Sequence, residues 1–293
     1  MKKLKPTNDY VFKKIFGSIG SENITREFIK CATGLKFEDI NLDTTPILEK
    51  DLIDKKTGIL DVKVVADKIN NIDIEMQVVK SEHIAERILF YWSKMYNKTI
   101  RKGYGYGYEK GQKVICILVA DFKLSNLTEV NKFYTRWKIM EENYTKLNFT
   151  DKLYIVIIEL EKIKDIKETE NKELLNWCKF IKNPEEMEGE EMKNKYIKKA
   201  KEKLDEINQS EEERRLAEIR ERTIRDSGYI DGKNDGIEIG IKEGEKKGKI
   251  EGRAETKKEM IKEMLKNNIS FEVILKITHM SRNEVEELMD FVK

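Results

Sequence analysis

The chain has 293 residues, of which 39% are hydrophobic and 38% are charged, and its formal net charge is +2. That length accommodates one domain of about 200 residues and an appendage. The near balance of charge means that any basic surface for nucleic acid must be local. Only two histidines occur, and the sequence has no Cys-x-x-Cys or Cys/His cluster. These features exclude a histidine-based catalytic triad, a HExxH metalloprotease and a zinc finger.

The composition also indicates where the protein works. The N-terminus begins with lysines but has neither the continuous apolar core nor the small-residue cleavage site of a signal peptide. No stretch approaches the roughly 18 apolar residues that a membrane-spanning helix needs. Cys31, Cys116 and Cys178 are odd in number and far apart, as expected of reduced core thiols. We therefore expect a cytoplasmic protein without a membrane span.

The alternation of polar and apolar residues predicts helices and strands through residue 183. The first two helices have cap candidates, Thr7 or Asn8 and then Ser21, and each ends at a glycine. In chain order we expect helices at 9–17 and 21–33, strands at 59–66 and 72–79, a helix at 81–101, a strand at 113–122, a helix at 129–142, a strand at 152–160 and a helix at 171–183. This order predicts a mixed α/β domain with a small central sheet.

Beyond Pro184 the composition changes. Residues 189–226 are rich in Lys, Glu and Arg with few apolar positions, which predicts an exposed helix. Glycine then recurs at every fourth position from Gly228 to Gly252. Because each glycine costs a helix about 1 kcal/mol relative to alanine, an isolated helix is not expected there. A mobile or conditionally ordered tail is the favoured interpretation, and a helix that orders by self-association is the second.

Two predicted strands carry polar residues where their neighbours are apolar. Asp61 and Lys63 share one face of the first strand, opposite Leu60, Val62 and Val64. On the second strand Glu75 and Gln77 share a face in the same way. The strands therefore bring two carboxylates together only if their polar faces coincide.

The pairing register decides whether the faces coincide. Directly opposed residues lie on the same side of a sheet, so Asp61 and Glu75 share a side only if the paired residue numbers have an even sum. An odd-length loop around residues 68–71, or a bulge, gives that result. A two-residue Asn70–Asn71 turn would place Glu75 on the opposite side.

Two carboxylates on adjacent strands form a hard oxygen site that suits Mg²⁺ or another divalent cation. Asp61 and Glu75 are the expected ligands, and the backbone carbonyl of Met76 is a third candidate. Phosphodiester cleavage uses such a metal to generate hydroxide from water and to neutralise the charge that develops on the phosphate. This pattern suits phosphodiester hydrolysis and leaves open whether the substrate is DNA or RNA.

The ordered motifs resemble the PD-(D/E)xK nucleases, and more narrowly the Rpn family of recombination-promoting nucleases, also described as transposases. The matching segments are TNDYVFKKIFG from Thr7, LDV from Leu60, IEMQ from Ile74, Arg87 with Tyr91, and LNWCKF from Leu175. The resemblance covers most of the chain, and the charged tail with repeated glycines is also typical of that family.

This resemblance implies a restriction-endonuclease-like core, metal-dependent DNA cleavage and a link to recombination or mobile elements. It places Asp61, Glu75 and Gln77 in the active site. Gln77 departs from the superfamily pattern, in which Lys is commoner. Glutamine cannot carry a charge and can only orient water or phosphate, so Lys63 or Lys80 is a candidate for the missing charge.

Four residues are candidates for DNA binding. Arg87 and Tyr91 lie four apart on one helix face, where they could reach a phosphate; the arginine could instead pair with Glu82 or Glu86. Arg101 and Lys102 begin a segment rich in tyrosine and glycine. That segment suits a DNA-contacting loop, but equally a simple connection between a helix and a strand.

The sequence therefore predicts an α/β protein in four parts: a nuclease-like core (1–185), a charged helix (186–226), a connector with glycine at every fourth position (227–253) and a small helical module (254–293). The expected activity is that of a Mg²⁺-dependent DNA endonuclease. One alternative is a DNA-binding or regulatory protein that keeps the fold without cleavage. Another is an oligomeric scaffold assembled through the tail.

Overall fold

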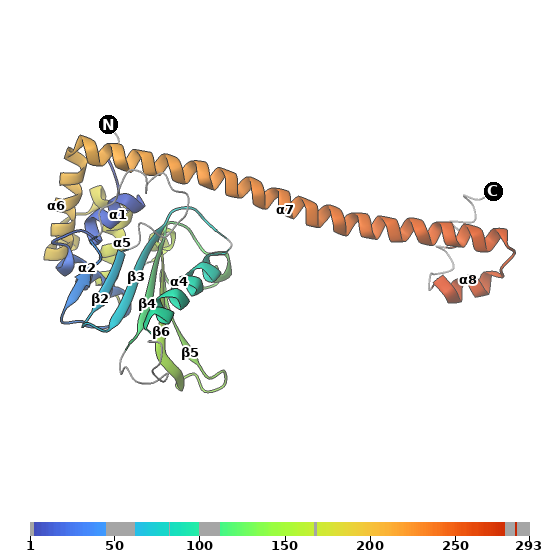
Figure 1. Cartoon of the computed structure of the whole chain (residues 1–293), viewed down its shortest axis with the longest axis horizontal. Coiled ribbons are helices and arrows are strands. Elements are labelled where there is room, and N and C mark those ends of the chain that lie inside the picture. The colour runs from blue at the N-terminus through green and yellow to red at the C-terminus, as the bar shows by residue number, and fades with distance from the viewer. Residues whose placement is uncertain are drawn as a thin grey trace. The chain divides into compact units, whose positions relative to one another are not determined.

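The computed structural model describes residues 3–44, 62–81, 83–99, 112–166, 169–278 and 285. The chain divides into two compact units, Met1–Ser227 and Gly228–Lys293 (Figure 1). Three candidate site residues, Asp61, Arg101 and Lys102, lie outside the described residues.

The first unit is built on a six-stranded mixed sheet with strand order β1-β2-β3-β4-β6-β5. Its strands are β1 (Ile40–Leu42), β2 (Val62–Ala66), β3 (Asn70–Gln77), β4 (Val114–Ala120), β5 (Tyr134–Met140) and β6 (Asn148–Glu159). The central strands β3, β4 and β6 run parallel, and the outer pairings are antiparallel. Every residue of β4 is apolar and buried, as expected of a parallel strand covered on both faces.

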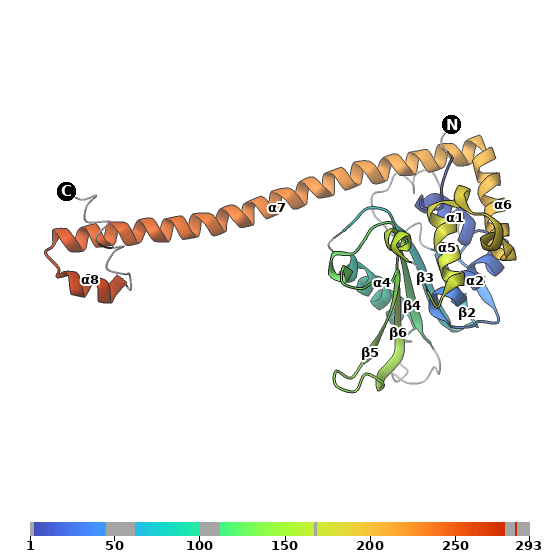
Figure 2. The same cartoon turned by 180° about the vertical axis from the view of Figure 1, so that it is seen from behind.

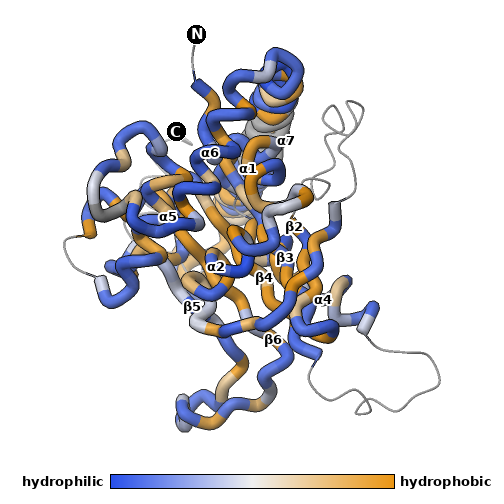
Figure 3. Tube along the Cα trace, turned by 90° about the vertical axis from the view of Figure 1, so that its left-hand side faces the viewer, coloured by the Kyte–Doolittle hydropathy of each residue, from blue (hydrophilic) through white to orange (hydrophobic). Residues whose placement is uncertain are grey.

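Helices cover both faces of this sheet (Figures 1 and 2). They are α1 (Asp9–Phe16), α2 (Glu22–Thr33), α4 (Ile84–Thr99), α5 (Lys172–Lys182) and α6 (Lys195–Gln209). One face carries the larger core, which joins α1, α2, α5 and α6 to alternate residues of the strands. The other face carries a smaller core beneath α4. The fold is therefore the expected α/β arrangement, and Figure 3 shows apolar residues concentrated along its strands.

The ends of the first helices follow from local chemistry. The Asn8 side chain caps α1 by accepting a hydrogen bond from the Val11 N–H. Ser21 precedes α2 but makes no side-chain cap; its hydroxyl donates to the Ile15 carbonyl at 2.6 Å instead. Gly34 ends α2 in the left-handed region, with φ of 77°, which glycine adopts without steric cost. The expected cap at Asn8 is confirmed, and that at Ser21 is wrong.

The helix expected at residues 129–142 is wrong, because Tyr134–Met140 forms the edge strand β5. This strand pairs antiparallel with β6, with Tyr134 opposite Ile158 at one end and Met140 opposite Asn148 at the other. Aromatic and β-branched residues suit that pairing, and the tertiary contact overrides the helical pattern. In α4, Ile84 and Ile88 are buried as expected. Leu89, next to Ile88 in the same helix, is exposed.

Residues 189–226 do not form the single exposed helix that was expected. They include α6 and the start of α7 (Glu211–Lys266). Four apolar residues of α6 at helical spacing are buried against the larger core: Ile197, Ala200, Leu204 and Ile207. The start of α7 is held on α1 by an ion pair of 2.9 Å between Arg220 Nε and Asp9 Oδ2, both buried. These apolar residues of the charged segment thus pack into the larger core.

In the second unit the glycine array is helical, although an isolated helix was not expected there, and the self-association of this helix stays a prediction. Helix α7 continues through Gly228–Gly252 without a break and ends at Lys266. A β-carbon added at Gly240, Gly244, Gly248 or Gly252 would meet nothing within 4 Å. Helix α8 (Phe271–Thr278) follows, and Ile261, Ile274 and Val285 form a small core. Within the described part of the chain, none of the helices combines the length and apolarity needed to cross a bilayer.

Candidate active site

The pairing of β2 with β3 has the parity that the metal-site hypothesis requires. Val62 lies opposite Ile74, and Lys63 lies opposite Asp73, so paired residue numbers have an even sum. The connection runs from Asp67 to Ile69, and Asp67 and Lys68 adopt positive φ values of 49° and 63°. This odd-length turn replaces the two-residue alternative, and Asn70 and Asn71 belong to β3 instead.

Strand β3 separates apolar from polar side chains. Ile72, Ile74 and Met76 enter the larger core. Asp73, Glu75 and Gln77 alternate with them and therefore share the opposite face, on the side of α4. On that face, the parallel pairing sets Asp73 beside Cys116 and Glu75 beside Leu118, both of which belong to the smaller core.

Two carboxylates of this face are buried. The exposed fraction is 4% for Asp73 and 5% for Glu75. Both line a cavity of about 10 Å³ together with Tyr91 of α4, which is room for about one water molecule. A buried carboxylate is costly unless charge or hydrogen bonds compensate it, so two of them beside one small cavity form a specialised site.

Two donors contact Glu75 at its Oε1 atom. Gln77 Nε2 donates to Glu75 Oε1 at 2.8 Å. Arg87 Nη2 forms an ion pair with the same oxygen. The guanidinium of Arg87 also lies 5.6 Å from the ring centroid of Tyr91. Arg87 therefore contacts Glu75, a carboxylate that the sequence pattern did not offer as its partner, while Glu82 lies outside the described residues.

The donor set fits a hard divalent cation. The two carboxylates and the amide oxygen of Gln77 are the oxygen ligands that Mg²⁺ prefers. The Met76 side chain is buried in the larger core, and its carbonyl lies in the chain between Glu75 and Gln77. Lys63 is exposed and pairs across the sheet with Asp73, and Lys80 is exposed beyond the end of β3.

Asp73 is the site residue that the sequence argument missed. The signal was present in the alternation Asp73, Glu75, Gln77, which places all three on one face of the strand. Asp73 was overlooked because the motif comparison begins at Ile74. The expected role of Asp61 depends on a residue that lies outside the described ranges.

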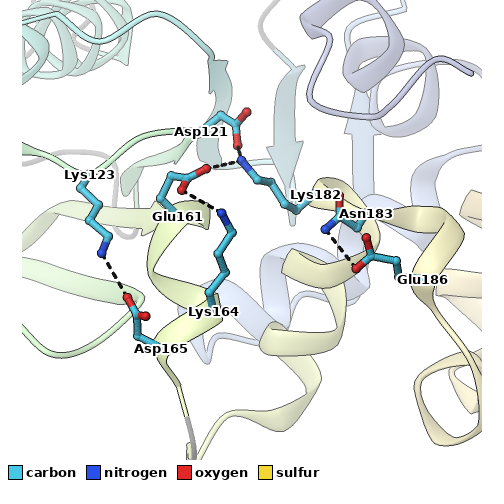
Figure 4. Close-up of polar contacts among 8 residues, drawn as sticks. All are labelled: Asp121, Lys123, Glu161, Lys164, Asp165, Lys182, Asn183 and Glu186. Atoms are coloured by element: carbon cyan, nitrogen blue, oxygen red, sulfur yellow. Dashed lines mark hydrogen bonds and ion pairs between the residues drawn. The ribbon is translucent and has the colours of Figure 1, made fainter. Parts of the chain in front are cut away.

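A second polar cluster joins the ends of β4 and β6 to α5 (Figure 4). Lys182 of α5 forms ion pairs with Asp121, which follows β4, and with Glu161, which follows β6. The Asp121 N–H donates to the Gln77 carbonyl at 2.8 Å. Burial lowers the pKa of Lys182, but hydrogen bonds and charges from both carboxylates outweigh it, so the pKa lies above its ordinary value. This cluster therefore supports the end of β3 that carries Gln77.

One other group among the described residues could offer three metal ligands, namely Glu27, Cys31 and Glu173. Burial, reinforced by the two carboxylates, raises the pKa of the Cys31 thiol to about 12. The protonated sulfur lies 3.6 Å from Glu173 Oε2 as a weak donor. Metals bind the thiolate, and thiolate is a poor ligand for Mg²⁺. This group is therefore a hydrogen-bonded thiol between α2 and α5.

Comparison with known proteins identifies the family of the chain. Neither the curated proteins nor the solved structures gave a match to the chain. A family described as "PD-(D/E)XK nuclease family transposase" matches residues 6–231. The matched range includes the sheet, α4, α6 and the start of α7. The six-stranded mixed sheet flanked by helices is the restriction-endonuclease-like core expected from the sequence. The chain thus belongs to the PD-(D/E)XK nuclease family transposases.

Proposed function

We propose that this protein is a metal-dependent endonuclease that hydrolyses phosphodiester bonds in DNA, in recombination or in the movement of mobile elements. The observation that carries the proposal is the buried acidic face of β3, where Asp73 and Glu75 line one cavity and Gln77 contacts Glu75. Nuclease chemistry is what the family membership supports, and paired buried carboxylates are what a metal needs.

In this proposal Asp61 and Glu75 hold the cation, with the carbonyl of Met76 as a third ligand. Asp61 directly precedes Val62 in the chain, and Val62 pairs with Ile74. Glu75 directly follows Ile74, so Asp61 and Glu75 are the sequence neighbours of one observed strand pair. Asp73, on the same face, adds negative charge that favours a divalent ion.

The remaining residues position the substrate and water. When bound, Mg²⁺ or another divalent cation supplies a hydroxide at neutral pH and neutralises charge on the phosphate. Gln77 orients the attacking water or a phosphate oxygen through its amide. Lys63 lies on the same face and supplies positive charge. Arg87, Tyr91, Arg101 and Lys102 contact the DNA backbone.

Nicking of a supercoiled plasmid by the full-length protein tests this function. We expect nicked circles with Mg²⁺ and none with a chelator, because hydrolysis requires the bound cation. A matched reaction with labelled single-stranded RNA measures whether the site prefers DNA. Absence of nicking with Mg²⁺ and with Mn²⁺, by protein that is folded by circular dichroism, would contradict the proposal.

A second candidate function is a DNA-binding or regulatory protein that has lost cleavage. The ion pair between Arg87 and Glu75 favours it, because a resident cation at a carboxylate competes with a metal. The plasmid assay separates the two functions. A non-cleaving protein would retard DNA in a gel without nicking it, and retardation would not depend on Glu75.

A further inference from the structure

Arg87 forms an ion pair with Glu75, the carboxylate that is proposed to bind the metal. Glu75 Oε1 accepts from Gln77 Nε2 and also pairs with Arg87 Nη2. We propose that Arg87 is the resident counter-ion of the metal site, and that its guanidinium leaves Glu75 when a divalent cation binds. This inference rests on the proposed function, because it takes Glu75 as a metal ligand.

Burial explains why a counter-ion is present. The side chain of Glu75 is only 7% exposed, and an uncompensated charge at such a position costs several kcal/mol. Arg87 is brought to it by α4, where Ile84 and Ile88 on either side of Arg87 are fixed in the smaller core. The protein thereby keeps Glu75 ionised and in place before the metal arrives.

The limited number of lone pairs and the repulsion between like charges explain why Arg87 must leave Glu75 when a metal binds. A carboxylate oxygen has about two lone-pair sites, and both on Oε1 are directed to Gln77 and Arg87. A divalent cation at Glu75 would also lie within a few ångströms of the guanidinium, where like charges repel strongly in a buried setting. The metal and Arg87 therefore compete for one carboxylate.

The ring of Tyr91 can stabilise the guanidinium after its ion pair with Glu75 breaks. It already lies 5.6 Å from the Tyr91 ring, and cation–π contact stabilises a charge there. The Arg87 Nε is buried and lacks a hydrogen-bond partner among the described residues, so the guanidinium does not use all of its donors in this position. Once released beside the metal, the planar guanidinium is suited to bind a phosphate with two hydrogen bonds.

Manganese binding tests this exchange without relying on activity. Mn²⁺ is titrated into the full-length protein at pH 8, and free Mn²⁺ is measured by electron paramagnetic resonance. We expect Arg87→Gln to bind Mn²⁺ at least about tenfold more tightly than wild type, the ratio produced by removing a competitor worth about 1.4 kcal/mol. Arg87→Lys should fall between them. Glu75→Gln should lose the site.

Lys94→Gln is the matched control, because it removes one positive charge from α4 at a residue that lies 6.0 Å from the Phe90 ring. Its Mn²⁺ affinity should equal that of wild type. If wild type binds Mn²⁺ and Arg87→Gln binds no more tightly, the exchange is refuted while the metal site stands. If neither protein binds Mn²⁺, the proposed function fails as well.

A second measurement uses the unaltered protein and so does not depend on how the variants fold. The ¹⁵Nε–¹Hε resonance of Arg87 is followed by nuclear magnetic resonance during a titration with Mg²⁺. We expect this resonance to move with saturation of the site, whereas that of Arg136, which donates from Nε to the Ala32 carbonyl, stays in place. An unchanged Arg87 resonance at saturating Mg²⁺ would overturn the inference.

Discussion

The side chain of Gln77 donates a hydrogen bond to Glu75, which lies two residues earlier on the same face of β3, and the Nε2 and Oε1 atoms are 2.8 Å apart. Lysine is the commoner residue at this position in the nuclease pattern that the sequence resembles. An amide can hold the carboxylate and orient a neighbour, but it brings no charge. The positive charge next to Glu75 comes from Arg87 instead.

Replacing Gln77 with alanine should slow cleavage without abolishing it. A hydrogen bond to a charged group is worth about 1.5–3 kcal/mol, so the rate should fall on the order of 10- to 100-fold. Single-turnover cleavage at saturating Mg²⁺ measures this directly. A complete loss of activity, equal to that of a carboxylate variant, would show that Gln77 does more than orient a neighbouring group by a hydrogen bond.

The Lys182 cluster should stabilise the fold far more than its exposed neighbour does. Lys182→Met leaves Asp121 and Glu161 facing each other without their cation, and we expect a loss of about 1–3 kcal/mol in unfolding free energy at pH 7. Lys164→Met is the matched control. Lys164 also pairs with Glu161, but its side chain is 63% exposed, so its loss should cost less than about 1 kcal/mol. Equal losses in urea unfolding would refute this ranking.

The stability that this cluster provides should depend on pH in a defined direction. The hydrogen bond from Lys182 holds the pKa of Glu161 below its ordinary value of 4.5. A carboxylate of lowered pKa stabilises the fold above that ordinary value and loses its contribution as the pH falls through the folded value. The difference between wild type and Lys182→Met should therefore shrink below about pH 4.5. Solvent screens the partly exposed Glu161, so the change should be modest. A difference that grows in acid would contradict the assignment.

The glycines of α7 should tolerate alanine. An added β-carbon at Gly240, Gly244, Gly248 and Gly252 meets nothing within 4 Å among the described residues, and each substitution should favour the helix by up to about 1 kcal/mol. We expect the fourfold alanine variant to gain helicity by circular dichroism. Analytical ultracentrifugation should give the same oligomeric state for variant and wild type if α7 is a connector. Loss of a wild-type oligomer in the variant would show instead that the small residues form an interface between copies.

The sequence predicted the framework of the site because its signals are local. Alternation on β3 fixed the face shared by Glu75 and Gln77, and the parity argument stated which turn between β2 and β3 was needed. The ion pair of Arg87 with Glu75 could not be predicted, because it depends on how α4 packs across β4. The same holds for β5, whose strand pairing with β6 is a contact between separate segments.

The glycine-rich part of α7 shows that helix propensity alone did not predict its structure. The helical cost of glycine made a helix improbable at residues 228–252, yet α7 continues through them. Intrinsic propensity is a weak prior within a long helix, since each added residue extends an existing nucleus. The start of that helix is fixed in the first unit by Arg220 and Asp9, which the sequence pattern alone did not pair.

Cleavage by Glu75→Gln beside Glu86→Gln tests the central claim most directly. The two residues differ in burial, since Glu75 lies in the acidic face of β3 and Glu86 is exposed on α4. Both variants lose one negative charge, and thermal unfolding shows whether each is folded. With saturating Mg²⁺ and a supercoiled plasmid, Glu86→Gln should nick at the wild-type rate and Glu75→Gln should show no activity above background. Wild-type cleavage by folded Glu75→Gln would place the active site elsewhere in the chain.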